Sequence, residues 1–299
     1  MPFKDRLHFF YSLVARACEN SSIAARLIRS LNFRGKGLIV ERIRSGAMCR
    51  EVVTTCNGIR YRLDLRDDVQ RELYFNIYEQ KDLAQAVELI PSGGTCLDIG
   101  ANNGVFALEF ARKVGGSGIV HSFEPDPYIF SRLAYNSRLN NYENILICHQ
   151  KAVSNIDGMM SFYCSEPEHS GWGSLVEFRD VAVRSEAVQT ITLDSFLAKE
   201  NISTVDFIKI DVEAHEPELL EGSSASLRNQ VFRYVLIEFN GFRLASRGKT
   251  LDDFLKPFAA AGYAPVKLRL DMLKKMQNKT IPSESVCANF LFAPGSQCR

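Results

Sequence analysis

The stretch from Cys96 to Gly104 constrains the fold of this chain more than any other part of its sequence. An apolar strand carries Asp98 near its end, and a loop from Gly100 to Gly104 leads directly into an apolar helix. A second apolar strand follows, and Glu124 stands at its end, twenty residues after Gly104. Glycine permits a sharp turn and a close approach to a ligand, and an acidic residue at the second strand end accepts ribose hydroxyls. The sequence therefore predicts a βαβ unit that binds a nucleoside.

The residues of this loop also indicate which nucleoside is bound. A dinucleotide fold carries the pattern G-x-G-x-x-G and leaves a helix N-terminus free for a pyrophosphate. Here the loop reads Gly-Ala-Asn-Asn-Gly, with Asn102 at its centre and Asp98 just before it. A carboxylate there repels a pyrophosphate but suits an amino-acid ammonium group. These residues favour S-adenosylmethionine over a nicotinamide dinucleotide, and a glycine turn without a ligand is a third interpretation.

Composition excludes several classes of protein. Hydrophobic residues are 46% and charged residues 24% of the chain, as in an ordinary globular protein. None of the eight cysteines forms a C-x-x-C pair, so neither a zinc ribbon nor a redox motif is indicated, and we expect a reducing cytoplasm. No apolar run reaches the roughly 20 residues that span a bilayer, and the N-terminus lacks the features of a signal peptide.

Charge is distributed unevenly along the chain. Residues 1–50 hold ten Lys or Arg against three Asp or Glu, a net charge of +7 that leaves −6 for the remainder. Residues 1–32 have apolar positions at helical spacing and a basic opposite face. Such a helix lies on an anionic membrane, binds a partner or packs on its own domain, and the sequence leaves these alternatives open. The acidic remainder offers no extended phosphate-binding surface, so we expect no nucleic acid partner.

The chain is predicted to comprise a basic helical segment, a lead-in hairpin and helix, and a cofactor-binding domain. Their predicted ranges are 1–50, 51–92 and 93–299. The lead-in contains a hairpin turn at Asn57-Gly58 and a helix over residues 70–90.

Strands alternate with helices from residue 95 onward. Strands are predicted at 95–99, 119–124, 145–148, 205–211, 232–239, 266–270 and 286–292. Helices are predicted at 104–114, 127–140, 217–227 and 251–261, with Asp126 and Thr192 as helix caps. Residues 159–191 are predicted to be an irregular stretch with extended pieces. This order predicts an α/β fold with a doubly wound, mostly parallel seven-stranded sheet and an N-terminal helical appendage.

Several segments together resemble the FkbM family of S-adenosylmethionine-dependent methyltransferases. They are Leu97–Gly104, Phe123–Asp126, Ile191–Ser195, Asp206–Glu213, and Glu216 with Leu219–Gly222, preceded by Asp67-Asp68 and Tyr78-Glu79. They occupy residues 65–240 in the family's order and spacing. The resemblance implies a class I, Rossmann-like methyltransferase that acts on a hydroxyl of a sugar, glycan or small metabolite. We expect its cofactor site to contain Glu79, Asp98, Gly100, Asn102, Gly104, Glu124 and Ala152.

The chain departs from the family pattern after Glu213. The family continues with glycine and a small residue, whereas this chain has Ala214 and His215. Alanine is a small change where the backbone φ is negative and a costly one where φ is positive. His215 is either a new proton acceptor or a polar residue that starts the next helix.

Ligands in a doubly wound sheet collect beyond the carboxyl ends of the strands, where Asp98, Glu124, Asp211 and Glu213 are predicted to lie. In an extended chain Asp211, Glu213 and His215 point to one side. We assign these three residues to catalysis, as acceptors of the proton of a substrate hydroxyl. A divalent cation held there, or a purely structural role at the turn and the helix start, are the alternatives; no metal ligand is assigned.

We therefore expect an S-adenosylmethionine-dependent O-methyltransferase, cytoplasmic or at the periphery of a membrane through residues 1–32. The sequence does not distinguish an oxygen from a nitrogen acceptor. A catalytically silent cofactor-binding module that acts through its N-terminal helix is one alternative. A nucleotide-dependent oxidoreductase is another, against which the missing third glycine and Asp98 both argue.

Overall fold

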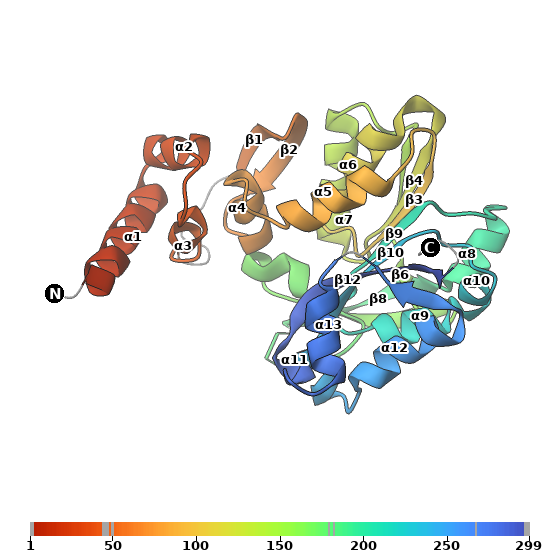
Figure 1. Ribbon diagram of the computed structural model, residues 1–299. Coiled ribbons are helices and arrows are strands. Elements are labelled where there is room, and N and C mark those ends of the chain that lie inside the picture. Colours follow the sequence, from red (N-terminus) through yellow and green to blue (C-terminus); the bar gives the residue numbers. More distant parts are fainter. Residues whose placement is uncertain are drawn as a thin grey trace. The chain divides into compact units, whose positions relative to one another are not determined.

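The computed structural model describes residues 3–43, 48, 51–178, 180–181, 183–266 and 268–295 (Figure 1). They form two units. The first is built from the chain up to Gln80 together with Glu166–Gly171, and the second from Lys81–Ser165 together with the chain from Trp172 onward. None of the described helices combines the length and apolarity that crossing a membrane requires.

The first unit contains helices and one hairpin. Its elements are α1 (Phe3–Asn20), α2 (Ser22–Ser30), α3 (Lys36–Val40), β1 (Glu51–Cys56), β2 (Ile59–Asp64) and α4 (Asp68–Tyr74). The predicted N-terminal helix is confirmed in the described part, with a break at Ser21, whose hydroxyl caps α2 by accepting from the amide of Ala24. The predicted hairpin is also confirmed. The single helix over 70–90 is wrong: α4 and α5 (Gln80–Leu89) are separated by a turn in which Asn76 has a φ of +57°.

The second unit is built on a seven-stranded sheet, as predicted. Its strands are β3 (Thr95–Ile99), β4 (Ile119–Phe123), β5 (Leu146–His149), β9 (Phe207–Ile210), β10 (Val235–Asn240), β11 (Tyr263–Pro265) and β12 (Cys287–Pro294). Their order is β11-β12-β10-β9-β3-β4-β5, and β12 runs antiparallel to both of its neighbours. The chain places β4 and β5 on one side of β3 and the later strands on the other, so the β3–β9 boundary is the switch point at which ligands bind.

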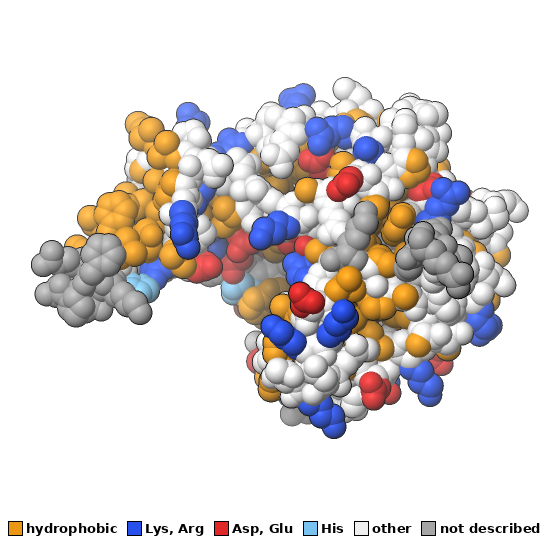
Figure 2. Space-filling model, in the orientation of Figure 1, with side chains coloured by type: hydrophobic (Ala, Val, Ile, Leu, Met, Phe, Trp, Pro, Cys, Tyr) orange, Lys and Arg blue, Asp and Glu red, His pale blue; other side chains and the backbone are white. Residues whose placement is uncertain are grey.

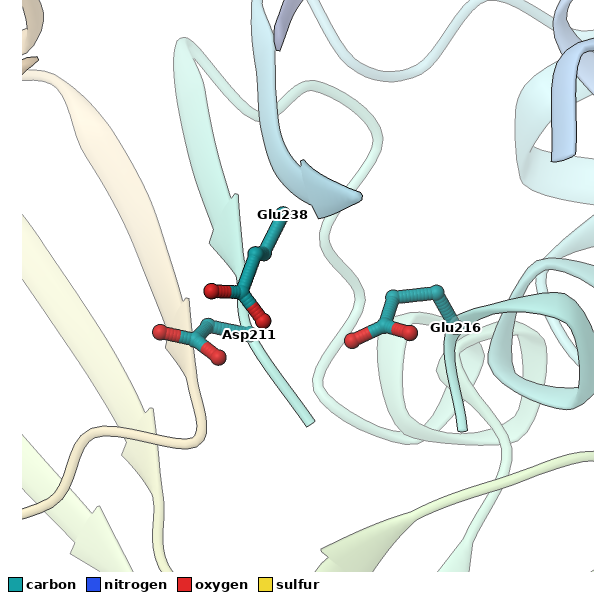
Figure 3. Close-up of side chains that lie close together, drawn as sticks. All are labelled: Asp211, Glu216 and Glu238. Atoms are coloured by element: carbon teal, nitrogen blue, oxygen red, sulfur yellow. The ribbon is translucent and has the colours of Figure 1, made fainter. Parts of the chain in front are cut away.

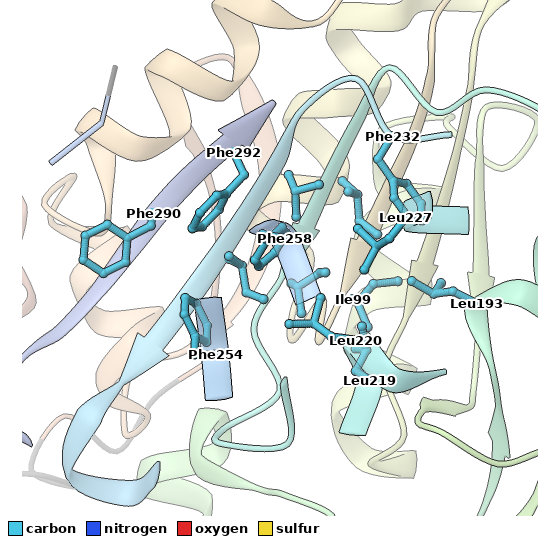
Figure 4. Close-up of a cluster of buried hydrophobic side chains, with 14 of the residues drawn as sticks. Ile99, Leu193, Leu219, Leu220, Leu227, Phe232, Phe254, Phe258, Phe290 and Phe292 are labelled. Atoms are coloured by element: carbon cyan, nitrogen blue, oxygen red, sulfur yellow. The ribbon is translucent and has the colours of Figure 1, made fainter. Parts of the chain in front are cut away.

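Helices cover both faces of this sheet. They are α6 (Val105–Val114), α7 (Pro127–Leu139), α8 (Leu193–Lys199), α9 (Glu216–Glu221), α10 (Ser224–Arg228), α11 (Gly241–Ser246), α12 (Leu251–Ala260) and α13 (Leu270–Gln277), with 3₁₀ turns η1 (Gly115–Ser117) and η3 (Ser283–Ser285). A further 3₁₀ turn, η2 (Pro167–Trp172), belongs to the first unit except for its last residue. Phe207 of β9 packs edge-on against Phe110 of α6. The next residue, Ile208, belongs to the large apolar cluster on the opposite face (Figure 4). In this cluster the ring of Phe258 of α12 stacks on that of Phe292, with 4.0 Å between the ring centroids.

Local sequence signals set the helix starts. Asp126 accepts hydrogen bonds from the amides of Tyr128 and Ile129 at the start of α7, and Thr192 accepts one from the amide of Ser195 at the start of α8. Both predicted caps are therefore confirmed. A helix cap joins residues that are close in the sequence, so a short segment is enough to predict it.

The extended pieces predicted within residues 159–191 are β7 (Gly158–Cys164) and β8 (Arg184–Ile191), which pair with each other; β8 also pairs with β6 (Ala152–Val153). Two other predictions about the second unit are wrong. The helix over 217–227 is two helices, α9 and α10, because Ser223, with φ −118° and ψ 15°, leaves the helical conformation between them. The strand over 266–270 is replaced by β11 at Tyr263–Pro265, since Arg269 has a φ of +51° and turns the chain into α13.

Candidate functional site

The loop after β3 contacts the segment after β9. Gly100 has a φ of +77°, and a Cβ on it would lie 1.8 Å from the backbone oxygen of Asp211. Only glycine fits this position, both because of its backbone conformation and because of this close approach. The predicted sharp turn at Gly100 is thus present, and it brings Asp211 beside the glycine loop.

Gly104 lies at the junction of the glycine loop and α6. Its φ is +95°, and a Cβ on it would lie 2.7 Å from the Leu133 side chain of α7. The expected approach of Gly104 to a ligand stays a prediction. In the structure its missing side chain lets α6 pack closely against α7.

Glu124 is brought to the same loop. Its side chain is buried, and its two oxygens accept from the amides of Asn102 and Asp126, each at 2.9 Å. Burial raises the pKa of Glu124 to about 8. Since a carboxylate oxygen has two lone pairs, each oxygen can accept a further hydrogen bond, for example from a ribose hydroxyl.

Asp98 lies fully buried in β3, between Ser122 of β4 and Lys209 of β9 in the register of the sheet. Neither carboxylate oxygen has a hydrogen-bond partner of good geometry in the part of the chain that the structure describes. Burial raises the pKa of Asp98 to about 6, and the Lys209 ammonium opposes that rise. Two buried carboxyl groups beside a glycine loop fit a ligand with an ammonium group and a diol, and they do not fit a phosphate.

The predicted catalytic carboxylates each have a basic partner. Asp211 accepts a hydrogen bond from the Lys209 ammonium at 3.0 Å. Glu213 accepts one from the Arg243 guanidinium at 2.5 Å. Burial and the charge of Asp211 raise the pKa of Glu213 to about 8, although Arg243 opposes that rise.

The backbone between Asp211 and His215 is not extended. Glu213 and Ala214 have φ values of +53° and +70°, so two successive left-handed residues turn the chain. The expectation that Asp211, Glu213 and His215 point to one side is therefore wrong. Alanine at position 214 is the costly case, since a left-handed residue with a Cβ loses about 1 to 2 kcal/mol.

His215 lies at the N-cap position of α9 and is buried. Its Nε2 is 2.9 Å from the Ser154 hydroxyl oxygen, and its Nδ1 is 3.7 Å from the Glu218 carboxylate. Burial lowers the pKa of His215 to about 4, which keeps the imidazole neutral. Of the two roles considered for His215, this environment is that of a polar residue that starts a helix.

The remaining predicted site residues lie elsewhere. Ala152 is buried in β6, where it pairs with Thr190 of β8. Glu79 belongs to the first unit, in the turn before α5, with a φ of +34°. His121 of β4 is buried, and its Nδ1 lies 3.1 Å from Nε2 of His149.

Sequence reasoning missed three charged residues at this site. Arg243 reaches Glu213 from α11 and also lies over the rings of Trp172 and Phe178, at 5.8 and 4.8 Å from their centroids. Nothing near Glu213 in the sequence signals this partner. Glu216 and Glu238 lie close to Asp211. A signal existed for Glu238, because it interrupts the apolar run of a buried strand.

Comparison with known proteins identifies related sequences. The methyltransferase FkbM domain matches residues 98–265, more than half of the chain. The hexuronic acid methyltransferase AglP of Haloferax volcanii is 28% identical over 143 residues, which cover 48% of this chain and 54% of AglP. The 31-O-demethyl-FK506 methyltransferase FkbM of Streptomyces tacrolimicus is 29% identical over 183 residues, which cover 50% of this chain and 67% of that protein. The chain thus matches about half to two thirds of the length of these relatives.

Solved structures with a similar chain course include a fibrillarin from Aeropyrum pernix in complex with natively bound S-adenosyl-L-methionine. Its TM-score is 0.42 at 16% identity, and the match covers 81% of this chain and 82% of that one.

Proposed function

Because the chain belongs to the FkbM family of S-adenosylmethionine-dependent methyltransferases, we propose that it methylates a hydroxyl group of a sugar, glycan or small metabolite. The observation that carries the proposal is the pair of buried carboxyl groups, Asp98 and Glu124, beside the glycine loop, with Glu213 across the β3–β9 boundary. The printed names of two relatives, a hexuronic acid methyltransferase and a 31-O-demethyl-FK506 methyltransferase, support an oxygen acceptor.

The residues of the loop fit the cofactor. We assign the ribose hydroxyls to Glu124, the ammonium group to Asp98, and close backbone contact to Gly100 and Asn102. Ala152 stays in the proposed set as a backbone contact. When bound, S-adenosylmethionine supplies a methyl group on a sulfonium sulfur, which is already an activated leaving group. The protein therefore needs to align the acceptor and to remove its proton.

Glu213 is our candidate for that proton acceptor. A pKa of about 8 lies near neutral pH, where a general base works best. Glu213 would take the proton that the acceptor hydroxyl loses as its oxygen takes the methyl group. Arg243 holds the Glu213 carboxylate in place, and the hydrogen-bonded pair of Asp211 and Lys209 lies beside it. We assign His215 a positioning role, since its bond to Ser154 fixes the turn that carries Glu213.

Calorimetric titration with S-adenosylmethionine, S-adenosylhomocysteine and NADH tests the cofactor assignment. We expect binding of the first two ligands and not of NADH. Glu124→Gln should weaken that binding at least about tenfold, since the amide loses the charge and one acceptor oxygen. Glu143→Gln, at an exposed turn, is the matched control and should bind as the wild type does. Binding of NADH alone would overturn the proposal.

Assays of Glu213→Gln separate catalysis from a silent cofactor-binding module. We expect methyl transfer to a panel of sugar and glycan acceptors to fall by about 10²- to 10⁴-fold, with S-adenosylmethionine affinity unchanged. If the wild-type protein binds the cofactor but transfers no methyl group, the silent module is the better description.

A membrane role for the N-terminal helices has support of its own. Large apolar side chains are exposed on α1, α2 and the segments that follow: Leu7, Phe9, Phe10, Leu13, Ile23, Leu27, Leu31 and Leu38. Figure 2 shows orange side chains gathered over α1 and α2. Within a segment of net charge +7, such a face suits the anionic cytoplasmic surface of a membrane.

Co-sedimentation with lipid vesicles tests this membrane role. We expect binding to vesicles that contain phosphatidylserine, and weaker binding to neutral ones. Phe9→Ser with Phe10→Ser should reduce the bound fraction several-fold. Equal amounts of protein in the pellet with and without vesicles would contradict the membrane role.

A further inference from the structure

Three acidic side chains converge just beyond the Gly100 loop. Asp211 follows β9, Glu238 lies in β10, and Glu216 begins α9 (Figure 3). One oxygen atom of each lies within 4.8 Å of those of the other two. Two oxygens bound to one Mg²⁺ or Ca²⁺ are separated by at most about twice the metal–oxygen distance, roughly 4 to 5 Å. The spacing is therefore that of a metal coordination shell.

Glu216 points into this cluster with an unsatisfied oxygen. The side chain is 0% exposed. Its Oε1 accepts from the amide of Val212 at 3.0 Å, whereas Oε2 has no hydrogen-bond partner among the described residues. In Figure 3 the carboxylate faces Asp211 and Glu238. A buried polar atom without a partner costs about 1 to 3 kcal/mol, so a bound group that satisfies it would stabilise the site.

Glu238 also has an oxygen without a partner, although its side chain is only half-buried. The Cys287 thiol, 3.4 Å away, donates to its Oε1, and Oε2 has no partner in the part of the chain described.

The charges nearby favour a divalent ion. When ionised, the three carboxylates carry −3, and the Lys209 ammonium on Asp211 reduces this to −2. The Arg243 guanidinium is already bonded to Glu213. One divalent cation would neutralise this remaining charge, whereas a monovalent cation would leave one negative charge without a partner.

We propose that Asp211, Glu216 and Glu238 bind a divalent cation that prefers oxygen ligands, such as Mg²⁺ or Mn²⁺. Hard cations of this kind are held by carboxylates and water. The binding of the ion does not depend on the identity of the methyl acceptor. Its role does rest on the proposed function: beside Glu213, the ion would polarise the acceptor oxygen and make its proton easier to remove.

Titration of the 299-residue protein with Mn²⁺ after treatment with EDTA tests the site. Bound Mn²⁺ is measured by electron paramagnetic resonance at pH 8, with Mg²⁺ as competitor. We expect one saturable site, displaced by Mg²⁺, and weaker binding at pH 6 because the ligands must be ionised. Glu216→Gln and Glu238→Gln should each weaken binding at least about tenfold. Glu143→Gln, which removes an exposed carboxylate, should bind as the wild type does.

Thermal unfolding gives a second measurement on the same proteins. Mn²⁺ should raise the Tm of the wild type and leave that of Glu238→Gln unchanged. No saturable uptake by the wild type, or unchanged binding by both Gln variants, would overturn the proposal. Calorimetry with S-adenosylmethionine in EDTA keeps the two claims apart: cofactor binding without Mn²⁺ binding refutes the metal site alone.

Discussion

The contact between Gly100 and Asp211 predicts how a single methyl group would affect the site. In Gly100→Ala the new Cβ would stand 1.8 Å from the backbone oxygen of Asp211, far inside van der Waals contact. Gly248 provides the matched control. Its φ of +70° is close to the +77° of Gly100, but a Cβ there would have no heavy atom within 4 Å.

The two variants share every cost except the clash. Alanine in the left-handed conformation lowers the free energy of unfolding by about 1 to 2 kcal/mol. Replacing glycine also reduces the entropy of the unfolded chain, which raises the free energy of unfolding by about 0.4 to 1 kcal/mol. Gly248→Ala should therefore lower the free energy of unfolding by about 1 kcal/mol. Gly100→Ala adds overpacking against backbone, typically 1 to 3 kcal/mol. We expect a gap of about 1 to 3 kcal/mol between the variants, or roughly 2 to 12 °C in Tm for a unit of this size.

The fluorescence of Trp172, the only tryptophan, follows unfolding of the second unit, which contains both glycines. Urea and thermal unfolding of both variants measure the gap, and calorimetry measures S-adenosylmethionine affinity, which we expect to fall only in Gly100→Ala. Equal stability of the two variants would refute the reasoning, since it would mean that the loop and the segment after β9 are not in contact.

Three further results are expected. Arg243→Gln removes the cation that opposes the rise in the pKa of Glu213, so the acid limb of the kcat/KM profile should move up by about one pH unit; an unmoved limb would argue against Glu213 as the base. His215→Ala leaves the buried hydroxyl of Ser154 without this partner and should cost about 2 to 4 kcal/mol of unfolding free energy in urea titrations, with the shape of the activity pH profile unchanged. Buried carboxyl groups such as Glu124, with a pKa of about 8, keep protons that the same groups lose above about pH 4.5 in the unfolded chain. The folded state therefore binds more protons than the unfolded state, and the free energy of unfolding in EDTA should fall from pH 5 to 8. The expected fall is at most about 1.4 kcal/mol per group and pH unit. Chemical denaturation at the two pH values measures it, and a rise with pH would contradict it.

The parts of the fold that depend on neighbouring residues could be predicted from the sequence. The glycine loop, the caps at Asp126 and Thr192 and the strands of the parallel sheet are local or periodic signals, and the structure has them. The hairpin of β7 and β8 was not recognised, because Met159–Cys164 pairs with a segment about twenty residues later across an irregular stretch.

The arrangement of the segment from Asp211 to His215 depends on distant residues. The left-handed turn at Glu213 and Ala214 is held by Arg243 of α11, which bonds the Glu213 carboxylate, and by Arg247 at the C-cap of that helix, which bonds the Ala214 carbonyl. Both arginines lie about thirty residues downstream, so alternation along an extended strand was the only pattern available, and it gave the wrong direction for His215.

The close approach of Gly100 to Asp211 would couple the two substrates of the proposed reaction. Gly100 belongs to the loop that we assign to the cofactor, and the backbone of Asp211 belongs to the segment that we assign to the acceptor. Neither backbone can shift toward the other without a steric clash, so an acceptor that pushed Asp211 toward Gly100 would also displace the loop. Thermodynamic reciprocity then requires each substrate to change the affinity for the other by the same factor. Methyl donor and acceptor would thus bind as an interdependent pair, with a single coupling free energy that both titrations report.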